Sequence, residues 1–318
     1  MSNSRVVADL KKIAGMDNVK VSEPMRSHTT FRIGGPADYF VTPQSTEHIQ
    51  QIVKYLKNRH IPYYIIGNGS NLLVSDNGYR GVIMQLYSRY SGYEFLHDDV
   101  KSAADKAGIV YIKVQSGMGM MRLAALAAEY SLEGMEFASG IPGSIGGGIM
   151  MNAGAYGGEM KDIVVRATVM DEDGNVRELD NTELEFGYRT SRVAAERLIV
   201  LEAVIALRPG NQKAIREKMQ EIAQSRRDKQ PLEYPSAGST FKRPQGYFAG
   251  KLIADAGLKG FTVGGAKVSE KHAGFVVNTG RATAGDVIEL TNQIADKIYQ
   301  LYGVKLELEV KKLGFDER

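Results

Sequence analysis

A glycine-rich segment at residues 139–158, SGIPGSIGGGIMMNAGAYGG, constrains the fold more than any other stretch of this chain. Five glycines fall within the nine positions from 140 to 148, and Asn152, Gly154 and a tyrosine follow them. A flexible linker is the alternative interpretation, but glycine-rich linkers are polar, and this segment carries isoleucine, methionine and tyrosine. Because glycine lets a backbone approach another group closely, we predict that the segment packs against a flat aromatic ligand.

Two further glycine clusters precede this segment. IIGNGSNLLV (65–74) directly follows a predicted strand, so its amides can form an anion-binding nest for a pyrophosphate, although a tight turn is the simpler interpretation of this cluster alone. It is not a Rossmann fingerprint, because Leu72 occupies the third glycine position, and no Walker Gly-Lys-Ser/Thr follows. TTFRIGGPA (29–37) adds Arg32 and two glycines. Three separated clusters suggest an extended dinucleotide ligand.

Hydrophobic periodicity predicts an α+β chain. Residues 38–42 form a predicted strand, after which apolar residues recur at helical spacing behind a Ser/Thr cap, at Ile49, Ile52, Val53 and Leu56. With the strand predicted at 61–67 they make a β-α-β unit. The other elements predicted in this half are strands at 81–86 and 109–117, an irregular stretch from about 87 to 108, and a helix at 120–132.

The second half continues this mixed pattern. Strands around 165–171 and 198–207 flank the turn EDGN (172–175), which suggests a mainly antiparallel sheet. We expect a domain boundary near residue 210. Beyond it we predict an amphipathic helix over 211–231 with Ile215, Met219 and Ile222 inward and Pro231 as its stop, a short helix over 247–257 capped by Gly257, a sheet region through 272–278, a capped helix from Thr283, and a last strand over 304–310 with Val304, Leu306, Leu308 and Val310 on one face.

Composition excludes several classes of protein. The chain contains no cysteine and its five histidines lack ligand-like spacing, so we expect no disulfide, no thiolate nucleophile and no metal. The formal net charge is only +3 with basic residues spread throughout, so nothing indicates a nucleic-acid partner. The N-terminus lacks the apolar stretch of a signal peptide, and no stretch approaches a membrane span. We therefore expect a cytoplasmic protein with no membrane partner.

The octapeptide AGSTFKRP (237–244) allows three roles for Ser239: a nucleophile, a turn residue or a proton donor. A lipase elbow needs G-x-S-x-G, and Phe241 occupies its final glycine position. Ser239 and Lys242 fit the S-x-x-K motif of penicillin-binding enzymes, and SDN occurs at 75–77. However, the two motifs stand in reversed order and no Lys-Thr-Gly exists, so we interpret this match as chance.

Other charged residues are ambiguous when each is taken alone. Tyr188 and Arg189, in FGYRTS, are typical of a surface turn, and Glu309 is typical of a solvated strand face. The basic residues within 226–229 could simply complement a helix macrodipole. Single residues therefore do not decide the function.

Eight segments taken in order resemble the UDP-N-acetylenolpyruvoylglucosamine reductase family, flavoenzymes of bacterial cell-wall precursor synthesis. They are TTFRIGGPA, IGNGSNLLV, GIPGSIGGGIMMNAGAYGGEM, FGYRTS, PSAGSTFKRP, GKLIADAGLKG, GGAKVSEKHAGFVVN and LELEV, and they span nearly the whole chain. The resemblance implies an α+β protein that holds FAD in two N-terminal subdomains of the vanillyl-alcohol-oxidase (PCMH) type. These would be residues 1–90, joined by 306–318 as the last strand returns, and residues 91–210, with a substrate-binding domain over 211–305.

The resemblance also implies a reaction. NADPH reduces FAD and leaves, and the enolpyruvyl ether of UDP-N-acetylglucosamine then takes the hydride to give UDP-N-acetylmuramate. The residues that match the family's catalytic positions are Arg189, Ser239 and Glu309. Arg189 and a protonated Glu309 would stabilise the enolate, and Ser239 would deliver the final proton, a demanding task for a hydroxyl unless the enolate is very basic. The implied cofactor-binding residues are Arg32, Gly67, Asn68, Gly69, Ser70, Asn71, Leu72, Gly140, Gly143, Ser144, Gly146, Gly147, Asn152, Ala153 and Gly154.

Substrate recognition is implied for fewer residues. Arg226, Lys229 and Arg243 are candidates for the diphosphate, because phosphates prefer guanidinium and ammonium partners, and Tyr188 is a further candidate. The short run after Arg189 resembles the family variety that lacks a loop closing over the substrate, so the aromatic residue that shields the nucleotide stays open. Gly148 departs from the family, which often carries alanine there, and the change is small beside a flavin.

Two other functions remain as alternatives. An FAD-dependent sugar or alcohol oxidase could share the fold, but such enzymes often tether flavin through histidine or cysteine, and neither major glycine cluster contains these residues. A non-catalytic flavin or nucleotide-sugar sensor could also share it, but a sensor has no need of Arg189, Ser239 and Glu309. The family resemblance implies a small-molecule substrate and no protein partner.

Overall fold

A computed structural model of the chain describes residues 3–96 and 108–315. These residues form two compact units, each described here by itself. The first comprises residues 1–20, 40–68 and 82–224, and the second comprises residues 21–39, 69–81 and 225–318, apart from the residues outside the described ranges. Each unit is therefore assembled from three separate stretches of chain.

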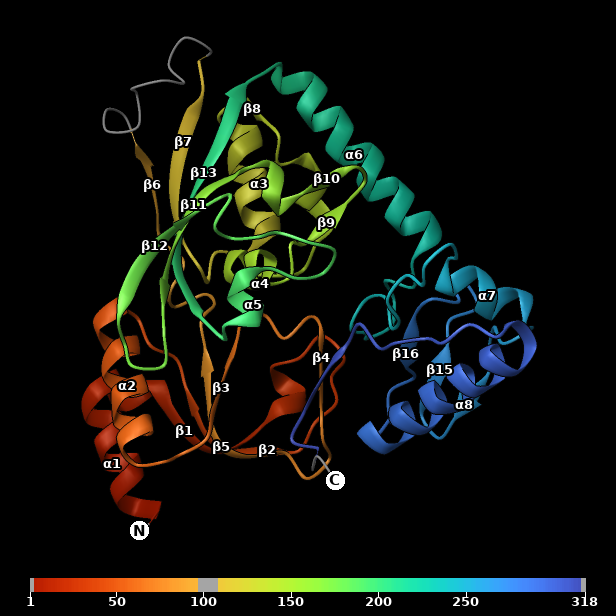
Figure 1. The fold of residues 1–318 in the computed structure, drawn as a ribbon, viewed down its shortest axis with the longest axis horizontal. Coiled ribbons are helices and arrows are strands. Elements are labelled where there is room, and N and C mark those ends of the chain that lie inside the picture. The colour runs from red at the N-terminus through yellow and green to blue at the C-terminus, as the bar shows by residue number, and fades with distance from the viewer. Residues whose placement is uncertain (1–2, 97–107, 316–318) are drawn as a thin grey trace. The chain divides into compact units, whose positions relative to one another are not determined.

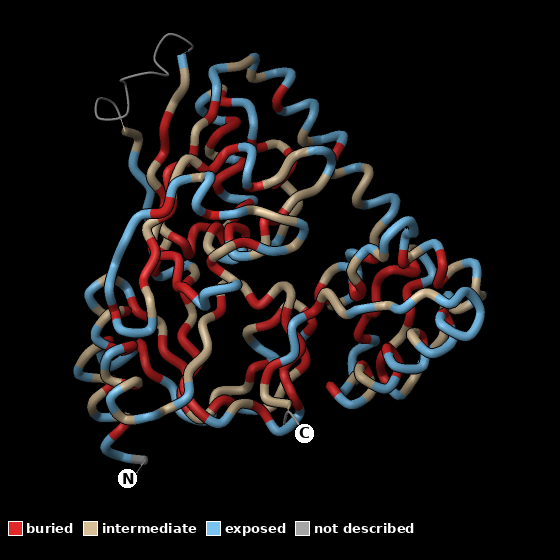
Figure 2. The backbone as a smooth tube through the Cα atoms, in the orientation of Figure 1, coloured by how far each residue is buried: buried red, intermediate tan, exposed pale blue. Residues whose placement is uncertain are grey.

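The first unit is built on a large antiparallel sheet of order β12-β11-β13-β7-β6, with β8 paired to β13. Alternate residues such as Ile112, Val114 and Ala203 are buried on one face, which α3 and α4 cover (Figure 1). Figure 2 shows buried positions gathered where these helices meet the strands. The bounds are β6 Tyr93–Leu96, β7 Val110–Gln115, α3 Met120–Glu129, β8 Leu132–Glu133, α4 Ile145–Met150, β9 Gly154–Ala155, β10 Gly158–Glu159, β11 Val164–Met170, β12 Val176–Asp180, α5 Arg192–Ala195 and β13 Ile199–Pro209.

Strand β6 corrects one expectation. Residues 87–108 were predicted to be irregular, yet Tyr93–Leu96 pairs with β7 in antiparallel register. The segment is short and follows a polar stretch, so its strand character comes from pairing with a neighbour rather than from local propensity. Residues 97–107 of that predicted loop lie outside the described residues.

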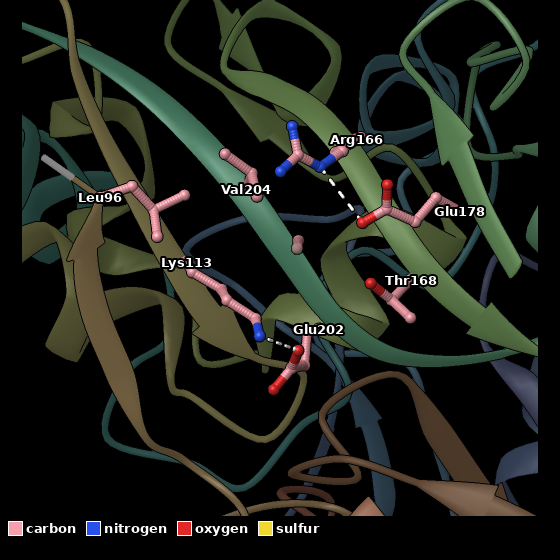
Figure 3. Close-up of a pocket in the computed structure, with 8 residues that line it drawn as sticks. Leu96, Lys113, Arg166, Thr168, Glu178, Glu202 and Val204 are labelled. Carbon is pink, nitrogen blue, oxygen red and sulfur yellow. Dashed lines mark hydrogen bonds and ion pairs between the residues drawn. The ribbon is translucent and has the colours of Figure 1, made fainter. Parts of the chain in front are cut away.

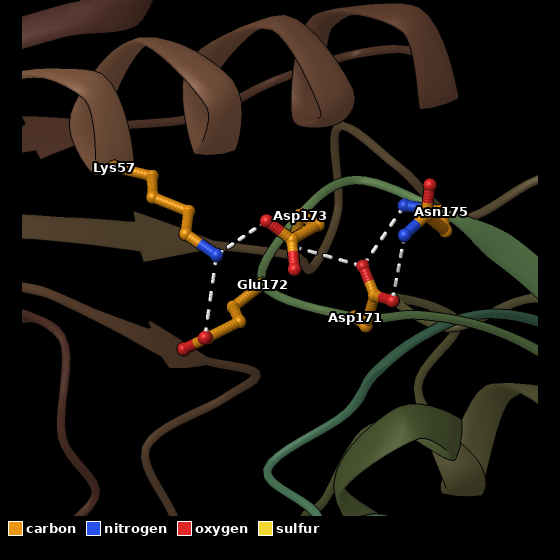
Figure 4. A network of polar contacts seen from close by, with 5 residues as sticks. All are labelled: Lys57, Asp171, Glu172, Asp173 and Asn175. Atoms are coloured by element: carbon orange, nitrogen blue, oxygen red, sulfur yellow. Dashed lines mark hydrogen bonds and ion pairs between the residues drawn. The ribbon is translucent and has the colours of Figure 1, made fainter.

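The EDGN turn also differs in what it connects. It joins β11 to β12, a strand that the sequence analysis did not predict, while β13 flanks β11 on the other side. Asp171 shapes the turn by accepting hydrogen bonds from the backbone N–H of Asp173 at 2.8 Å and of Asn175 at 2.9 Å. Lys57, near the end of helix α2, contacts Glu172 at 3.3 Å and also pairs with Asp173 (Figure 4). The mainly antiparallel sheet that this turn suggested is confirmed, but the strand that follows the turn is β12 and not the predicted 198–207.

A four-stranded sheet has the order β1-β2-β5-β3, with β3 and β5 parallel. Helix α2 begins behind Ser45, whose hydroxyl accepts a hydrogen bond from the backbone N–H of His48 at 3.2 Å. All four predicted inward residues of this helix are fully buried. The bounds are α1 Asn3–Ala14, β1 Val19–Pro24, β2 Pro36–Val41, α2 Thr46–Asn58, β3 Tyr63–Ile66 and β5 Tyr79–Gln85.

Helix α6 (Gln212–Lys229) confirms its predicted face, since Ile215 and Ile222 are buried and Met219 is half-buried. It ends before Pro231, which cannot continue a helix. The division between the two units falls within this helix, between Gln224 and Ser225.

The second unit surrounds a separate apolar core. The three-stranded antiparallel sheet β14-β15-β16 and helices α7 and α8 contribute to it, and Gly257, with φ of +71°, ends α7 as expected. Strand β17 runs parallel to β4. The bounds are β4 Leu72–Val74, α7 Ala249–Asp255, β14 Thr262–Val263, β15 Ala266–Val268, β16 Val276–Asn278, α8 Ala284–Tyr302 and β17 Lys311–Leu313.

The prediction of a last strand over 304–310 is wrong, because no regular strand forms there. The apolar face predicted for the same residues does pack on the core. The regular strand lies further on, at β17, and only Leu308 in the predicted range forms an isolated bridge, with Phe241. Val304, Leu306 and Leu308 nevertheless pack on the core of the second unit, and Val310 is part of it. Alternation predicted the burial, whereas a strand also needs a continuous partner. Of the described helices, none is long and apolar enough to cross a bilayer.

Candidate functional site

Arg189 lies on a tight turn of the first unit. Gly187 and Thr190 close the turn, with the backbone N–H of Gly187 donating to the carbonyl of Thr190 at 3.0 Å. The φ angle of Arg189 is +55°, a conformation that few residues other than glycine adopt, and its guanidinium carbon lies 5.4 Å from the ring centre of Tyr188. The turn predicted for these two residues is confirmed. A strained arginine on an exposed turn is a candidate functional group.

Ser239 and Glu309 are brought close together in the second unit by main-chain bonds. The backbone N–H of Glu309 donates to the carbonyl of Thr240 at 2.9 Å, and that of Lys242 donates to the carbonyl of Glu307 at 2.8 Å. These bonds flank the bridge between Phe241 and Leu308, so residues 239–242 run antiparallel to 307–310. Ser239 is exposed and Glu309 is half-buried. Two of the three predicted catalytic residues therefore share one short ladder.

Thr240 attaches this ladder to strand β16, a role that the sequence analysis did not predict. Its side chain is buried, and its hydroxyl accepts a hydrogen bond from the backbone N–H of Val276 at 2.9 Å. Asn71, predicted to bind the cofactor, donates from its side-chain amide to the carbonyl of Glu309 at 3.2 Å. Glu309 is thus held through both its backbone N–H and its carbonyl. The sequence signal that could have identified Thr240 is that a β-branched residue directly follows Ser239.

Within the first unit, two glycine clusters meet. A Cβ atom at Gly67 would lie 2.1 Å from the hydroxyl oxygen of Ser144, so only glycine fits there. The amide of Asn68 donates to the carbonyl of Pro142 at 2.6 Å. Ser144 caps α4 by accepting from the backbone N–H of Gly147 at 3.3 Å. Residues 67 and 68 of the predicted nest therefore lie against residues 142–144 of the glycine-rich segment.

Within the second unit, the remaining glycine cluster lies against the same loop. A Cβ atom at Gly69, where φ is +62°, would lie 2.2 Å from the carbonyl oxygen of His28, and the backbone N–H of Thr30 donates to the carbonyl of Gly69 at 3.3 Å. Arg32 is exposed and has a φ angle of +55°. Gly69 thus lies against the 29–37 cluster within the second unit.

The residues of the first unit fit a large polar cofactor. The hydroxyls of Ser116 and Ser139 are buried without a hydrogen-bond partner among the described residues, which is a costly state for a polar atom. Ser139 immediately precedes Gly140, and a Cβ at Gly146 would lie 2.8 Å from the Cβ of Ser116. Both serines thus lie in or beside the glycine-rich segment. The serine in QSG (115–117), directly after a strand, was a signal that the sequence analysis did not use.

The other predicted cofactor residues lie in the same segments. The carbonyl of Gly143 accepts a hydrogen bond from the backbone N–H of Met120 at 2.9 Å. A Cβ atom added at Gly148 would lie 3.0 Å from the sulfur of Met120. An alanine at Gly148 would meet only methionine side chains, and the expected tolerance of glycine beside a flavin stays a prediction. The remaining members are Ser70 and Leu72 at the start of β4, Gly140 at the end of a short 3₁₀ helix, and Asn152, Ala153 and Gly154 after α4.

The predicted diphosphate residues lie in two places within the second unit. Arg226 and Lys229 lie in the last turn of α6, three residues apart and so on one side of the helix. The guanidinium of Arg243 stacks on the ring of Phe248, with 4.0 Å between the guanidinium carbon and the ring centre. Phe248 is 58% exposed. This stack presents both a cation and an aromatic surface to solvent.

The SDN motif has a structural explanation. The carboxylate of Asp76 accepts hydrogen bonds from the backbone N–H groups of Ala284 at 2.8 Å and Gly285 at 3.0 Å, at the beginning of α8. Ser75 accepts from the backbone N–H of Asn77 at 3.2 Å. The motif caps a helix, and its likeness to a penicillin-binding motif is coincidental.

A hollow on the polar face of the large sheet contains none of the predicted residues (Figure 3). Its charges are satisfied within the protein, because Lys113 pairs with Glu202 at 2.7 Å and Arg166 with Glu178 at 3.3 Å. We therefore place the candidate site at the glycine clusters and at the two catalytic segments. Among the described residues, no group of three or more histidine, aspartate or glutamate side chains could hold a metal ion.

Two family models match separate parts of the chain. The model for the FAD binding domain matches residues 37–180. The model for the C-terminal domain of UDP-N-acetylenolpyruvoylglucosamine reductase matches residues 230–313. The first match includes the glycine clusters of the first unit, and the second includes Ser239 and Glu309.

Individual proteins are similar over nearly the whole chain. UDP-N-acetylenolpyruvoylglucosamine reductase of Clostridioides difficile (strain 630) is 48% identical over 316 residues, which cover 99% of this chain and all of that protein. The corresponding protein of Agathobacter rectalis is 49% identical over 292 residues, covering 92% and 93% of the two chains. Among solved structures, the reductase of Thermus caldophilus matches 93% of this chain and 98% of its own, with 33% identity and a TM-score of 0.76.

Proposed function

The chain belongs to the UDP-N-acetylenolpyruvoylglucosamine reductase family, and from this premise we propose that it reduces the enolpyruvyl ether of a UDP-sugar to UDP-N-acetylmuramate. The reaction would use FAD as cofactor and NADPH as reductant, in the synthesis of peptidoglycan precursors. The observation that supports this proposal best is 48% identity over 99% of the chain to a protein of that name.

We propose that FAD is held by the three glycine clusters, through the residues that the sequence analysis named apart from the side chain of Asn152, whose two donors are bound within the protein. Backbone amides and the hydroxyls of Ser116 and Ser139 would supply donors, and the glycines would allow close approach. When bound, FAD supplies the two-electron chemistry by accepting hydride from NADPH and passing it to the substrate. Under the same proposal, FAD would be held by two subdomains, residues 1–90 with 306–318 and residues 91–210. Residues 211–305 would form the substrate-binding domain.

Arg189 would stabilise the charge that develops on the substrate. Addition of hydride to the terminal carbon of the vinyl group leaves negative charge on the adjacent carbon, delocalised into the carboxylate as an enolate. A guanidinium is permanently charged and can form a fork to a carboxylate. Glu309 can donate a hydrogen bond to the same anion when it is protonated. Together these groups would lower the barrier by binding the transition state more tightly than the substrate.

Ser239 would end the reaction by giving its hydroxyl proton to the substrate carbon. Its side chain is exposed while its backbone neighbour Thr240 is buried, so the hydroxyl is accessible on a rigid support. The diphosphate would meet Arg226, Lys229 and Arg243, with Tyr188 also at the substrate. We propose the cytoplasm as the location, because NADPH is an intracellular reductant.

The test separates the two half-reactions. NADPH is first added anaerobically and bleaching of the flavin is followed, and the UDP-enolpyruvyl sugar is then added and return of the colour is followed. Ser239→Ala should leave the first rate unchanged and slow the second by about 10²-fold or more, the scale expected for a general acid. Ser236→Ala, three residues earlier, is the matched control and should leave both rates unchanged.

Several outcomes would contradict the proposal. Equal slowing of both half-reactions by Ser239→Ala would mean that Ser239 is not the proton donor. Reduced flavin that is never reoxidised by the UDP-sugar would rule out this substrate and favour a sensor. Acid precipitation should release the flavin, whereas colour that stays in the pellet would indicate the covalent attachment common in sugar oxidases.

A further inference from the structure

The side chain of Asn152 is fully engaged by the protein. Its residue is only 2% exposed, and its amide group donates to the carboxylate of Glu159 at 2.8 Å and to the carbonyl of Gly187 at 3.2 Å. Its side-chain oxygen accepts from the backbone N–H of Lys161 at 3.0 Å. A primary amide has two N–H donors, and both are used here. Asn152 therefore has no side-chain donor left for a cofactor.

The backbone of Asn152 is also specialised. Its φ angle is +44°, a conformation that asparagine tolerates better than most residues. It follows directly on the end of α4, and its own N–H donates to the carbonyl of Ile149 at 3.3 Å. This geometry directs the amide away from the helix and toward the turn that begins at Gly187.

That turn carries Arg189. Gly187 is its first residue and Thr190 its last, so the carbonyl held by Asn152 lies two residues from the arginine. On the other side of the turn, the hydroxyl of Ser191 donates to the carbonyl of Met150 at 3.0 Å. Both ends of the turn are thus attached by side chains to the residues around the end of α4.

We propose that Asn152 is a positioning residue for Arg189, an inference that rests on the proposed function. The residue was predicted to bind the cofactor, but its contacts indicate that its side chain acts through the arginine turn. Displacement of a charged group by about 1 Å can cost about 10²-fold in rate, so each anchor of this strained turn is a sensitive point.

The first test replaces the two donors of Asn152 without changing its shape. Asn152→Asp should slow reoxidation of the reduced flavin by the UDP-enolpyruvyl sugar by about 10-fold to 10²-fold, while reduction by NADPH and the flavin-to-protein ratio stay unchanged. Asn181→Asp is the matched control, because the Asn181 amide also bonds two carbonyls of the first unit, those of Lys161 at 2.9 Å and Val164 at 2.6 Å. The control should leave both half-reactions unchanged.

The second test asks whether Asn152 acts through Arg189. In a double-mutant cycle, Asn152→Asp should slow reoxidation in the wild-type background and have little further effect in the Arg189→Ala background. Equal slowing in both backgrounds would overturn the inference. Loss of flavin from the Asn152→Asp protein would also overturn it, because the residue would then be a cofactor ligand.

A second variant guards against a folding defect. Asn152→Gly keeps the positive φ angle without strain and places no new charge beside Glu159, so it should fold and show the same selective slowing. Normal reoxidation in this variant would contradict the inference. Failure of the proposed function is recognised separately, because Arg189→Ala alone would then slow both half-reactions equally or neither.

Discussion

The two proposed catalytic segments are held in different ways. The Arg189 turn depends on side chains, since Asn152 and Ser191 bond its two ends. The pair formed by Ser239 and Glu309 depends mainly on backbone hydrogen bonds between 239–242 and 307–310. Any residue except proline can supply a backbone N–H, whereas a side-chain anchor is lost with one substitution. The comparison suggests that a single substitution displaces Arg189 more easily than it displaces Ser239 and Glu309.

The largest effect on the Ser239 segment should come from Thr240, its one buried side-chain anchor. Thr240→Val removes the acceptor for the N–H of Val276, which should lower the free energy of unfolding by about 1–3 kcal/mol. We also expect flavin reoxidation by the UDP-sugar to slow by about 10-fold, because Ser239 and the carbonyl that binds Glu309 lose their support. Urea unfolding and the two half-reaction rates check these expectations.

Thr291→Val provides the control for Thr240. Thr291 is also buried and lines a small apolar gap that Thr240 lines as well, but its hydroxyl donates to the carbonyl of Ile288 in its own helix at 2.9 Å. It should leave both half-reactions unchanged. If Thr240→Val also left both half-reactions unchanged, the backbone hydrogen bonds alone would be sufficient to hold Ser239 and Glu309 in place. The Arg189 turn would then be the only one of the two segments that depends on side chains.

An intermediate effect is expected from Asp286, which supports the sheet behind Ser239. Its carboxylate accepts hydrogen bonds from the backbone N–H of Gly265 at 2.9 Å and of Thr283 at 3.0 Å, and these bonds lower its pKa below 3.8. Because the pKa is lower in the folded state, the stabilisation is present at neutral pH and is lost as pH falls through the folded pKa. Asp286→Asn should therefore cost about 1 kcal/mol at pH 7 and progressively less in acid.

The measurement for Asp286 is urea unfolding from pH 7 down to about pH 3, the range in which linkage predicts the change. Asp296→Asn, at an exposed position of the same helix, is the control and should change the free energy of unfolding by no more than about 0.5 kcal/mol. A cost that stays constant with pH would mean that the charge of Asp286 is unimportant to the support of this region.

The smallest effect should come from Lys242, which pairs with Glu307 at 3.0 Å across the same ladder. Both side chains are largely exposed, and surface ion pairs of this kind contribute little. Lys242→Met should leave stability and both half-reactions unchanged within error, because the backbone bonds of residue 242 remain. Substantial slowing of reoxidation would show that the ladder depends on side chains after all.

Much of the fold could be predicted because the signals are local. Helical spacing identified all four buried residues of α2, and Thr283 begins α8 as its cap, with Asp286 completing the capping box. The α+β class and the family, inferred from eight ordered segments, are confirmed. These predictions succeeded because periodicity and caps depend on neighbouring residues only.

The remainder depends on distant partners. Nothing in the sequence near Asn152 indicates that its amide bonds Gly187, and nothing near SDN indicates that Asp76 caps a helix 208 residues away. β6 and the segment 304–310 were misassigned for the same reason, since strand formation requires a partner that local pattern does not specify. The roles of the individual site residues stay predictions, which the experiments above address.

The pairing of β4 with β17 has a consequence for the synthesis of the protein. Leu72, Leu73 and Val74 are at most 4% exposed in the finished fold, yet the β17 residue that pairs with Leu72 is Lys311, which is synthesised 239 positions later. Until β17 has been synthesised, this apolar strip has an open edge, and such edges attract other chains. The nascent polypeptide thus carries an unpaired apolar strand until β17 is made and pairs with it.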